Sequence, residues 1–568
     1  MRTDIDTLRE LDQLSPFEIK DKLIALAEEH AKKSAMAMLN AGRGNPNWIA
    51  TTPREAFFTL GHFALTESKR VLDLEGVGGM PPKAGCAGRL KTWCEKNASL
   101  PGADFLYNMV PFAEEEFGFD ADAFVHELTD SIIGDNYPVP DRCLVHNEKV
   151  SHAYLMWAMC SDRPPKGKFD LFAVEGGTAA MCYVFKTLKA NRLLRPGDTI
   201  ALGTPIFTPY LEMPHLEDYD LKIINVNAVQ ENRFQISDEE LKKLEDPKIK
   251  MFFLVNPGNP SSMATSPDVI TKLVKLVKNK RPDLMILTDD VYGTFVKHFR
   301  SLMADLPHNT IGVYSYSKYW GCTGWRLGII AVHEDNIFDK MIGKLPEEDR
   351  EALNTRYGTI SLEPEKIKFI DRLVADSRDV ALNHTAGLSL PQQVMMTLFS
   401  IAELMDEKKK YQAEVMAIVQ RRAWALIEGL GVELKPNPLF SYYYGIVDFE
   451  FWIKKYVGPE VMEFIKKHYH PLDIVFRLAE DHSIVLLNGG GFSAPDWSAR
   501  VSFANLDDNV YGYIGRALRS VARAYVEAYR FASDGGAGSA PTPPARRGTK
   551  TGKTIKRTDA PYEKTLHA

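Results

Sequence analysis

The feature that most constrains this chain is a regular alternation of short apolar runs with helical patterns between residues 171 and 332. The apolar runs are LFAVEGG, TIALG, LKIINV, KMFFLVNP, LMILTDD, TIGVYSYSK and RLGIIAV. Strands of this length separated by helices need right-handed crossovers, so they predict a mostly parallel sheet covered by helices on both faces. We therefore expect an α/β fold with its ligand site at the carboxyl ends of the strands.

The N-terminal segment has a different pattern. Apolar residues recur at helical spacing from Phe17 to Leu39, with Ser15 as a cap and Pro16 in the first turn, until Gly42 breaks the pattern. This segment is interpreted as a helical arm. The stretch that follows is rich in helical patterns and carries no recognisable chemistry.

The C-terminal third predicts a second, smaller α/β unit. A helical insertion from about Asn336 to Asp379 precedes a long helix from near Leu398 through Gly429, and then the strands FSYYYGIVDF, SIVLLNG and ARVSFAN. The expected divisions are an arm with part of the small domain (1–50), a large domain (51–397) with helical insertions at about 60–135 and 336–379, a small domain (398–532) and a disordered tail (533–568).

The tail is rich in Gly, Pro, Ala, Lys and Arg, with too little apolar surface to offset the entropy of ordering. A weak nucleic-acid contact through Arg546, Arg547 and Lys550 is the alternative interpretation.

Composition excludes several classes of partner. A net charge of -6 gives no broad field for nucleic acid or an acidic membrane surface, so small molecules are the expected partners. The six cysteines form no CxxC pair or zinc spacing, which favours reduced thiols and no metal site. The acidic N-terminus does not resemble a secretory signal, and no apolar run approaches the roughly 20 residues of a membrane span, so a cytoplasmic location is expected.

The strongest motif is Ser315-Tyr-Ser-Lys318-Tyr-Trp-Gly-Cys-Thr-Gly-Trp-Arg326, which follows an apolar strand. It resembles the lysine signature of the class I aminotransferases, which use pyridoxal 5'-phosphate. The resemblance implies that Lys318 holds the cofactor as a Schiff base, while Arg326 and Ser315 bind its phosphate. It also implies the type I fold of these enzymes, with a seven-stranded, mostly parallel sheet in the large domain.

Two further motifs match the cofactor-binding segments of the same family. Glu175-Gly-Gly-Thr-Ala-Ala closes a strand and opens a helix, where free backbone N–H groups favour an anion, and the resemblance assigns Gly177 and Thr178 to the phosphate. In Thr204-Pro-Ile-Phe-Thr-Pro-Tyr, Phe207 takes the place of the aromatic residue that stacks on the pyridine ring.

Two loops that follow strands match residues around the cofactor ring. Asn256-Pro-Gly-Asn-Pro-Ser resembles the NPxNPT element, in which Asn259 would bind the phenolic oxygen of the cofactor together with Tyr292. Thr288-Asp-Asp-Val-Tyr resembles the D-x-x-Y element, whose carboxylate keeps the ring nitrogen protonated. The spacing to Tyr292 favours Asp289 over Asp290 for this role.

Substrate and subunit contacts are also implied by the resemblance. Arg500, in Ala-Arg-Val-Ser-Phe-Ala, matches the arginine that binds the α-carboxylate of the substrate. Gly-Asp-Asn-Tyr137-Pro matches the segment whose tyrosine reaches the phosphate of a neighbouring subunit, and the segment from His384 to Ser389 matches a second interface loop. A homo-oligomer of at least two subunits is therefore expected.

Three features separate the chain from ordinary aminotransferases: the helical region before Tyr137, the 336–379 insertion, and the segment AGRGNPNW at 41–48. The combination resembles the aspartate 4-decarboxylases, which convert L-aspartate to L-alanine and carbon dioxide, also transaminate with 2-oxo acids, and form large assemblies. We expect Arg43 and Gly44 beside the substrate, although a solvated loop arginine is nearly as good an interpretation of Arg43. Lys20 is a weaker candidate.

Two other functions stay open from the sequence. An ordinary aspartate or aromatic amino acid aminotransferase would use the insertions for assembly alone. A regulator that keeps this fold as a cofactor-binding module would need a DNA-binding domain, and the short N-terminal arm shows none.

Overall fold

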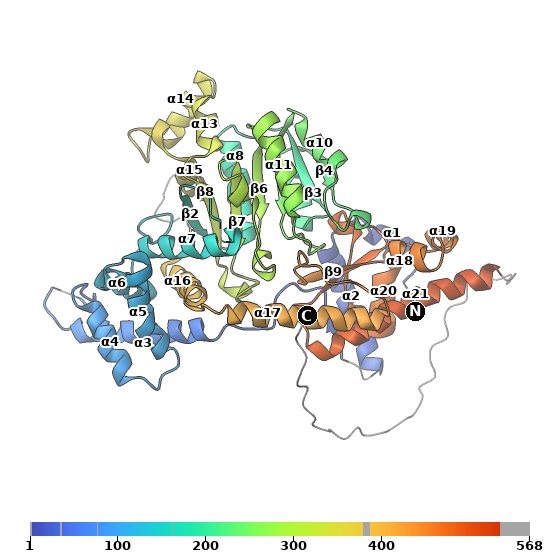
Figure 1. The fold of residues 1–568 in the computed structure, drawn as a ribbon, viewed down its shortest axis with the longest axis horizontal. Helices are drawn as coiled ribbons and strands as arrows, with labels where there is room; N and C mark the ends of the chain where they lie inside the picture. Colours follow the sequence, from blue (N-terminus) through green and yellow to red (C-terminus); the bar gives the residue numbers. More distant parts are fainter. Residues whose placement is uncertain (1–2, 35–36, 77, 162, 379–386, 534–568) are drawn as a thin grey trace.

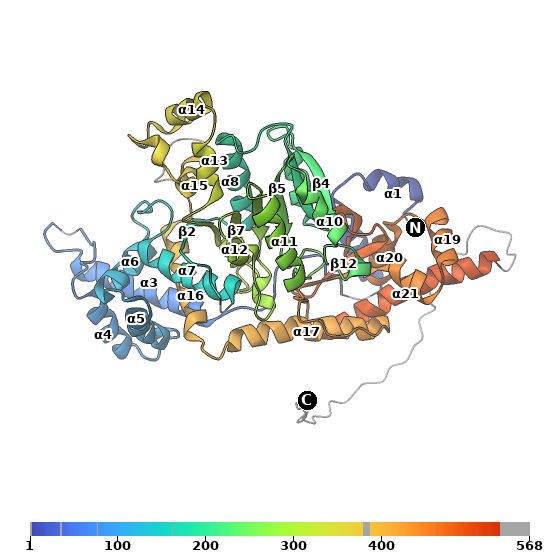
Figure 2. The same cartoon turned by 45° about the horizontal axis from the view of Figure 1, so that its top comes forward.

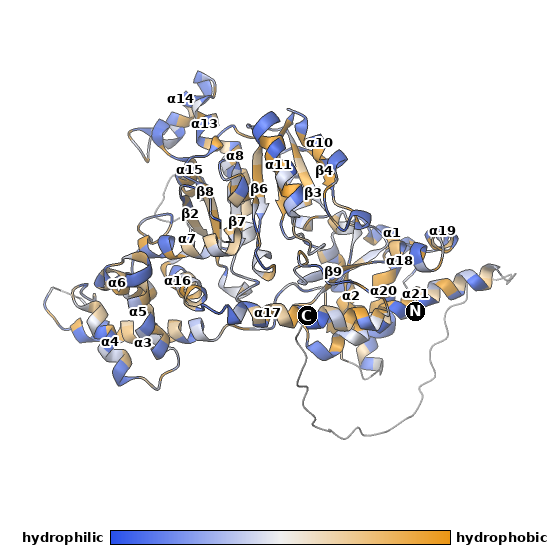
Figure 3. Cartoon of the chain, viewed as in Figure 1, coloured by the Kyte–Doolittle hydropathy of each residue, from blue (hydrophilic) through white to orange (hydrophobic). Residues whose placement is uncertain are grey.

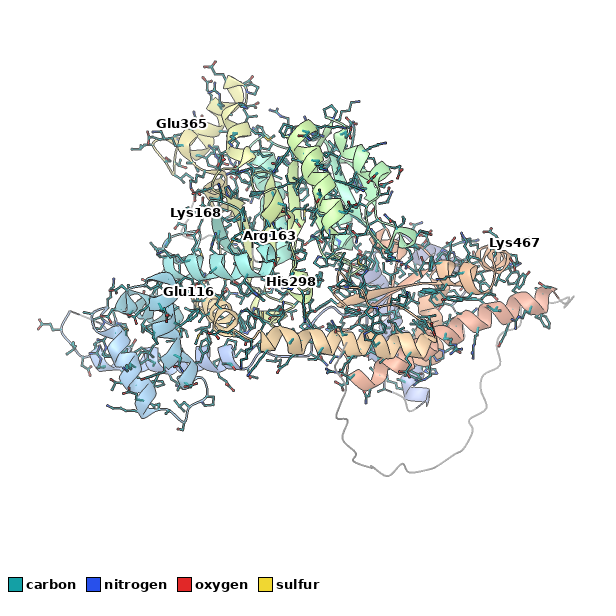
Figure 4. The ribbon with its side chains drawn as sticks, in the orientation of Figure 1. Glu116, Arg163, Lys168, His298, Glu365 and Lys467 are labelled. Carbon is teal, nitrogen blue, oxygen red and sulfur yellow. The ribbon has the colours of Figure 1, made fainter. Side chains whose placement is uncertain are left out.

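The computed structural model describes residues 3–34, 37–76, 78–161, 163–378 and 387–533. Figure 1 shows a central sheet with a helical region on one side and a second, smaller unit on the other. Glu116 and Lys467, labelled at opposite ends of the molecule in Figure 4, mark these two outer parts.

The central sheet has seven strands in the order β2-β8-β7-β6-β5-β3-β4. β8 runs antiparallel to both of its neighbours, and the other pairs are parallel, which confirms the expected mostly parallel sheet. The strands are β2 (Phe169–Val174), β3 (Thr199–Thr204), β4 (Lys222–Asn227), β5 (Ile249–Val255), β6 (Met285–Asp289), β7 (Thr310–Ser315) and β8 (Gly328–His333).

Alternate residues of these strands are buried in two different clusters, one on each face of the sheet. On β5, Met251 and Phe253 pack in the cluster that includes α8, whereas Phe252 packs with α11. A strand buried on both faces has no polar side, which explains the unbroken apolar runs in the sequence. The helices of the two layers and their connections are α8 (Gly177–Ala190), α9 (Thr208–Glu212), α10 (Asp238–Lys242), α11 (Pro267–Lys280), α12 (Leu302–Asp305) and α15 (Phe369–Ser377).

The region before the sheet is a bundle of helices with an apolar core of its own. Its helices are α3 (Thr52–Val71), α4 (Cys86–Lys96), α5 (Ala103–Phe117) and α6 (Ala121–Ile133), which pack against α16 (Leu390–Met405), while α7 (Val145–Cys160) joins this bundle to the sheet. The insertion after the sheet forms α13 (Ile337–Gly343) and α14 (Glu347–Tyr357), and the hydrophilic colouring of α14 in Figure 3 fits its exposed position.

The second unit is built on a three-stranded sheet in the order β11-β12-β9. The N-terminal segment joins it, because β1 pairs in parallel with β10 and α2 packs on α20. Its elements are α1 (Ile5–Leu11), α2 (Pro16–Ser34), β1 (Leu39–Asn40), α17 (Lys410–Leu430), β9 (Tyr444–Asp448), α18 (Phe449–Tyr456), α19 (Pro459–His468), α20 (Asp473–His482), β10 (Ile484–Val485), β11 (Leu487–Asn488), β12 (Ser498–Ser502) and α21 (Tyr511–Ser533). In Figure 2, α17 extends from below the large sheet to α21.

Two expected helices have different bounds. The helix expected from Phe17 to Leu39 ends at Ser34, because Leu39 pairs with Ile484 in a strand. The single helix expected from near Leu398 is divided into α16 and α17, and Lys409 at the start of α17 has a left-handed φ of 50°. The first difference comes from a tertiary contact, and the second comes from a turn that no glycine or proline marks. The domain boundaries themselves stay a prediction.

The proposed tail contacts at Arg546, Arg547 and Lys550 lie outside the described residues. Among the helices that the structure describes, none has both the length and the apolar character needed to span a bilayer.

Candidate active site

A cavity of about 290 Å³ opens at the carboxyl ends of the parallel strands. β2, β3, β5, β6 and β7 all end at this edge, and β8, which is antiparallel, begins there. Eleven of the predicted site residues, spread over more than 450 positions, line the cavity: Gly44, Gly177, Thr178, Phe207, Asn259, Asp289, Tyr292, Ser315, Lys318, Arg326 and Arg500.

One end of the cavity is suited to an anion. The first turn of α8 begins at Gly177, and Gly176 before it has a left-handed φ of 90°. A Cβ on Gly176 would lie 2.6 Å from Nη2 of Arg326, so the guanidinium packs directly on this turn. Arg326 has no carboxylate partner among the described residues, and Ser315 lies beside it on the cavity wall. Backbone N–H groups, a hydroxyl and a forked cation therefore face the same space.

Asp289 lies on the cavity wall at the end of β6. Tyr210 Oη donates a hydrogen bond to its Oδ2 at 2.8 Å, and the Val291 backbone N–H donates to its Oδ1 at 3.2 Å. Burial raises the pKa of Asp289, while the Tyr210 and Val291 hydrogen bonds and the charge of Lys318 oppose that rise. The carboxylate is thus a buried group that a cationic partner in the cavity would stabilise.

Asp290 points away from the cavity. Thr288 Oγ1 donates to its Oδ1 at 2.8 Å, and Ser301 Oγ donates to its Oδ2 at 2.5 Å. Burial raises the pKa of Asp290 to about 8, so the group is mostly neutral at pH 7. The geometry therefore favours Asp289, as the motif spacing does, for any role in the cavity.

Lys318 lies between these two ends. Its Nζ donates a hydrogen bond to the Gly44 carbonyl oxygen at 3.0 Å, and Tyr443 Oη donates to the same oxygen at 2.8 Å. The segment around Gly44 therefore closes over the lysine from the side opposite the sheet.

Arg500, on β12, is 2% exposed and lies between two aromatic rings. Its Cζ is 4.3 Å from the Tyr444 ring centroid and 4.7 Å from that of Phe492. Nη1 donates to Asn259 Oδ1 at 3.0 Å and Nη2 to the Gly42 carbonyl at 2.8 Å, while the buried Nε has no partner among the described residues. Burial lowers the pKa of this guanidinium, so an anion placed beside it would be strongly favoured.

Comparison with known proteins identifies the family of this chain. The model for aminotransferase class I and II matches residues 174–518. The chain belongs to this aminotransferase family.

Individual relatives agree with this assignment. A Pseudomonas protein named bifunctional aspartate aminotransferase and L-aspartate beta-decarboxylase is 46% identical over 524 residues, covering 92% of this chain and 98% of the relative. The aspartate aminotransferase of Sulfolobus acidocaldarius is 29% identical over 152 residues, which cover 26% of this chain and 37% of that protein. The structure of the Rhizobium meliloti aspartate aminotransferase, 15% identical, covers 90% of this chain and 96% of its own with a TM-score of 0.56, which shows the fold.

Several residues that line this aminotransferase's cavity were missed in the sequence. Tyr210 was recoverable, since it ends the same TPIFTPY motif that contains Phe207. Tyr444 belongs to an expected strand, but nothing in the strand pattern tells which of three consecutive tyrosines faces the site. Phe17, on the arm helix α2, contacts Phe207 edge to face at 5.8 Å and carries no local signal at all.

Two predicted site residues do not line the cavity of this chain. Tyr137 is 67% exposed, and Arg43 is exposed on the loop before Gly44. Lys20, the weaker candidate, lies 3.7 Å from Asp21 in an ion pair. The roles expected for Tyr137, Arg43 and Lys20 therefore stay predictions.

The first expected interface segment packs against the start of α16, close to the second segment in the sequence. A Cβ on Gly134 would lie 3.3 Å from Cγ of Pro391, which is two residues beyond the second segment. Within that segment, residues 384–386 lie outside the described part of the chain.

Proposed function

We propose that this aminotransferase-family enzyme uses pyridoxal 5'-phosphate to decarboxylate L-aspartate to L-alanine and carbon dioxide, and that it also transaminates L-aspartate with 2-oxo acids. The observation that carries the proposal is that Lys318 lines one cavity together with the anion-binding turn of α8 and with Asp289, on whose carboxyl group its charge acts. The Pseudomonas relative, which carries both activities in its name and matches over 98% of its length, supports the choice of substrate.

The residues present fit the cofactor. Arg326 and the first turn of α8 suit a phosphate, and the buried Asp289 suits a protonated ring nitrogen, whose positive charge would stabilise the carboxylate against burial. Phe207 and Val291 also line the cavity and suit an aromatic ring, while Lys318 offers the amine. When bound, pyridoxal phosphate supplies a conjugated system that accepts the electron pair of a broken bond at the substrate.

The chain supplies orientation and proton transfer. Arg500, held by Asn259, would bind the α-carboxylate through its two forked nitrogens, which fixes the bonds at Cα relative to the ring. The Lys318 amine would then move the proton at Cα. Arg43, one residue before the cavity-lining Gly44, is proposed to approach the side-chain carboxylate. Unchanged aspartate kinetics in Arg43→Ala would remove it from the mechanism.

We also propose a homo-oligomer of at least two subunits, in which Tyr137 reaches the phosphate of a neighbour. The exposure of Tyr137 supports this arrangement. Size-exclusion chromatography with light scattering measures the number of subunits, and an active monomer would contradict the proposal.

A cytoplasmic location is proposed from the thiols. All six cysteines are unpaired, and five of them are buried, which suits a reducing compartment.

An ordinary aspartate aminotransferase is the second candidate, because a shorter match to such enzymes covers part of the chain. The two functions differ in the products that they form from L-aspartate. The test is to incubate the holoenzyme with L-aspartate and no added 2-oxo acid, and to measure alanine and carbon dioxide over many turnovers. Sustained release of both supports the decarboxylase, whereas a single turnover that yields oxaloacetate alone supports the ordinary aminotransferase.

A further inference from the structure

The decarboxylation that we propose requires a proton at a second carbon. L-aspartate and one proton give L-alanine and carbon dioxide, with no net oxidation or reduction. The bond between Cβ and the side-chain carboxyl carbon breaks, and its electron pair must finally form a new C–H bond at Cβ. Transamination of L-aspartate needs no such step, so a group that protonates Cβ serves decarboxylation alone.

Most groups that line the cavity are unsuited to deliver this proton. The two arginines, Arg326 and Arg500, do not release protons at ordinary pH. Asp289 and Tyr210 are hydrogen-bonded to each other where the ring nitrogen would bind. Lys318 already has the proton at Cα to move.

Tyr444 is placed differently, at the end of a directed chain of hydrogen bonds. Asn259 Nδ2 donates to Tyr292 Oη at 3.5 Å, and Tyr292 Oη donates to Tyr444 Oη at 3.3 Å. Within the described residues, the proton of the Tyr444 hydroxyl has no acceptor. The hydroxyl therefore receives one hydrogen bond from the protein and has its own proton left for a molecule in the cavity.

The same hydroxyl lies where the substrate must bind. A methyl carbon built on Gly44 would lie 2.3 Å from Tyr444 Oη and 3.5 Å from Lys318 Nζ, so both groups lie close to Gly44 on the cavity wall. The Tyr444 ring also packs on Arg500. A substrate held by its α-carboxylate on Arg500, with Cα near Lys318, would bring Cβ, which is one bond from Cα, close to the Tyr444 hydroxyl.

We infer that Tyr444 is a catalytic residue that donates the proton to Cβ after carbon dioxide has left. The O–H bond of Tyr444 breaks, the electron pair left by the carboxyl group forms the C–H bond, and the phenolate takes a proton from solvent. This inference rests on the proposed decarboxylase function and assigns to Lys318 and Tyr444 separate carbons of the substrate.

Tyr444→Phe tests the inference, because it removes the hydroxyl and keeps the ring on Arg500. The holoenzyme variant is given L-aspartate, and the formation of alanine and of oxaloacetate is followed separately. Alanine formation should fall by about 10²-fold, the lower range for a general acid, while the single-turnover rate of oxaloacetate formation stays near the wild-type rate. The affinity for pyridoxal phosphate, measured by quenching of protein fluorescence in the apoprotein, should not change.

Tyr442→Phe is the matched control, since Tyr442 packs against Phe440 and Trp424 outside the cavity. It should leave the ratio of the two products as in the wild type. An unchanged ratio in Tyr444→Phe, or an equal fall of both products, would overturn the inference. A wild-type enzyme that forms oxaloacetate but no carbon dioxide would instead overturn the proposed function, and this inference with it.

Discussion

The cavity has two walls that are built in different ways. The sheet wall consists of residues next to strand ends of one sheet: Gly177, Thr178, Phe207, Asn259, Asp289, Ser315, Lys318 and Arg326. The closing wall consists of Phe17, Gly44, Tyr444 and Arg500, which come from the arm helix, the loop after β1, and the strands β9 and β12.

The difference lies in how many separate elements build each wall. The neighbouring strands of one sheet fix the sheet wall through backbone hydrogen bonds, so its residues keep their relative positions. In the closing wall only β9 and β12 pair with each other, and side-chain contacts to backbone oxygens, such as those of Lys318 and Tyr443 to Gly44 and of Arg500 to Gly42, hold the segment around Gly44 against them and against the sheet wall. We therefore expect changes in the sheet wall to abolish the chemistry, and changes in the closing wall to alter how the substrate is bound and which product forms.

The largest expected effect is that of Lys318→Ala, in the sheet wall. Without the amine there is no covalent attachment and no base for Cα, so both activities should fall by about 10⁴-fold or more. Besides the two activities, the borohydride-reducible yellow absorbance of the purified protein is measured. It should be present in the wild type and absent from the variant. A variant that keeps substantial activity would contradict the assignment of the whole sheet wall.

The neighbouring aspartates give a sharper test of the same wall. Asp289→Asn removes the charge opposite the ring nitrogen and should lower kcat/KM for L-aspartate by about 10²- to 10³-fold, as the loss of one electrostatic contact at a reacting centre does. Asp290→Asn should stay near the wild-type value, because Asp290 is already mostly neutral and is bonded to Thr288 and Ser301. Equal losses of kcat/KM in the two variants would contradict the assignment of Asp289, because the aspartate that faces the cavity would then matter no more than its neighbour.

In the closing wall, Gly44→Ala should have a smaller effect. The new methyl group would lie 2.3 Å from Tyr444 Oη, whose ring is packed on Arg500 and cannot simply turn away. Overpacking of this kind costs about 1–3 kcal/mol, which predicts a loss of roughly tenfold or more in kcat/KM. Gly42→Ala is the comparison, since its methyl group would lie 3.3 Å from the side chain of Leu487 and needs a much smaller shift. A loss at Gly42 as large as that at Gly44 would contradict the argument from contact distance.

How much of the site could be predicted follows the same division. Lys318, Asp289 and Asn259 were found because each belongs to a short motif next to a strand end, where a parallel sheet collects its functional side chains. In the closing wall, Arg500 was found from its motif, whereas Phe17 and Tyr444 depend on how separate segments pack. No local pattern contains that information.

The fold shows the same limit. All seven strands of the large sheet were predicted, because most of them are buried on both faces and leave apolar runs, and the partly exposed edge strand β4 still carries Ile223, Ile224 and Val226. The end of the arm helix at Ser34 and the break before Lys409 were not, because pairing of Leu39 with Ile484 and a left-handed lysine leave no mark in the sequence.

The break before Lys409 lies beneath the sheet wall and is held by a buried carboxyl group. Tyr319, which follows Lys318, donates its hydroxyl to Glu403 Oε2 at 2.6 Å, and Lys409 Nζ lies 3.5 Å from Oε1. Tyr411 Oη, on α17, donates to the Tyr319 carbonyl oxygen at 2.8 Å. Glu403 thus joins the lysine loop to the helix that leads to the second unit.

Glu403→Gln should give the smallest effect, on stability and not on the reaction. Burial raises the pKa of Glu403 from 4.5 to about 7, against the opposing influence of Tyr319 and Lys409. The folded state therefore binds the proton more tightly than the unfolded state, so this group stabilises the fold below about pH 4.5, and that contribution is lost as the pH rises to 7. Glutamine still accepts the Tyr319 hydroxyl but does not titrate, so the Tm of the variant relative to wild type should rise between pH 5 and 7 and then level off. A difference in Tm that is constant over this range would show that Glu403 stays charged beside Lys409, and that the joint between the lysine loop and α17 is an ordinary ion pair.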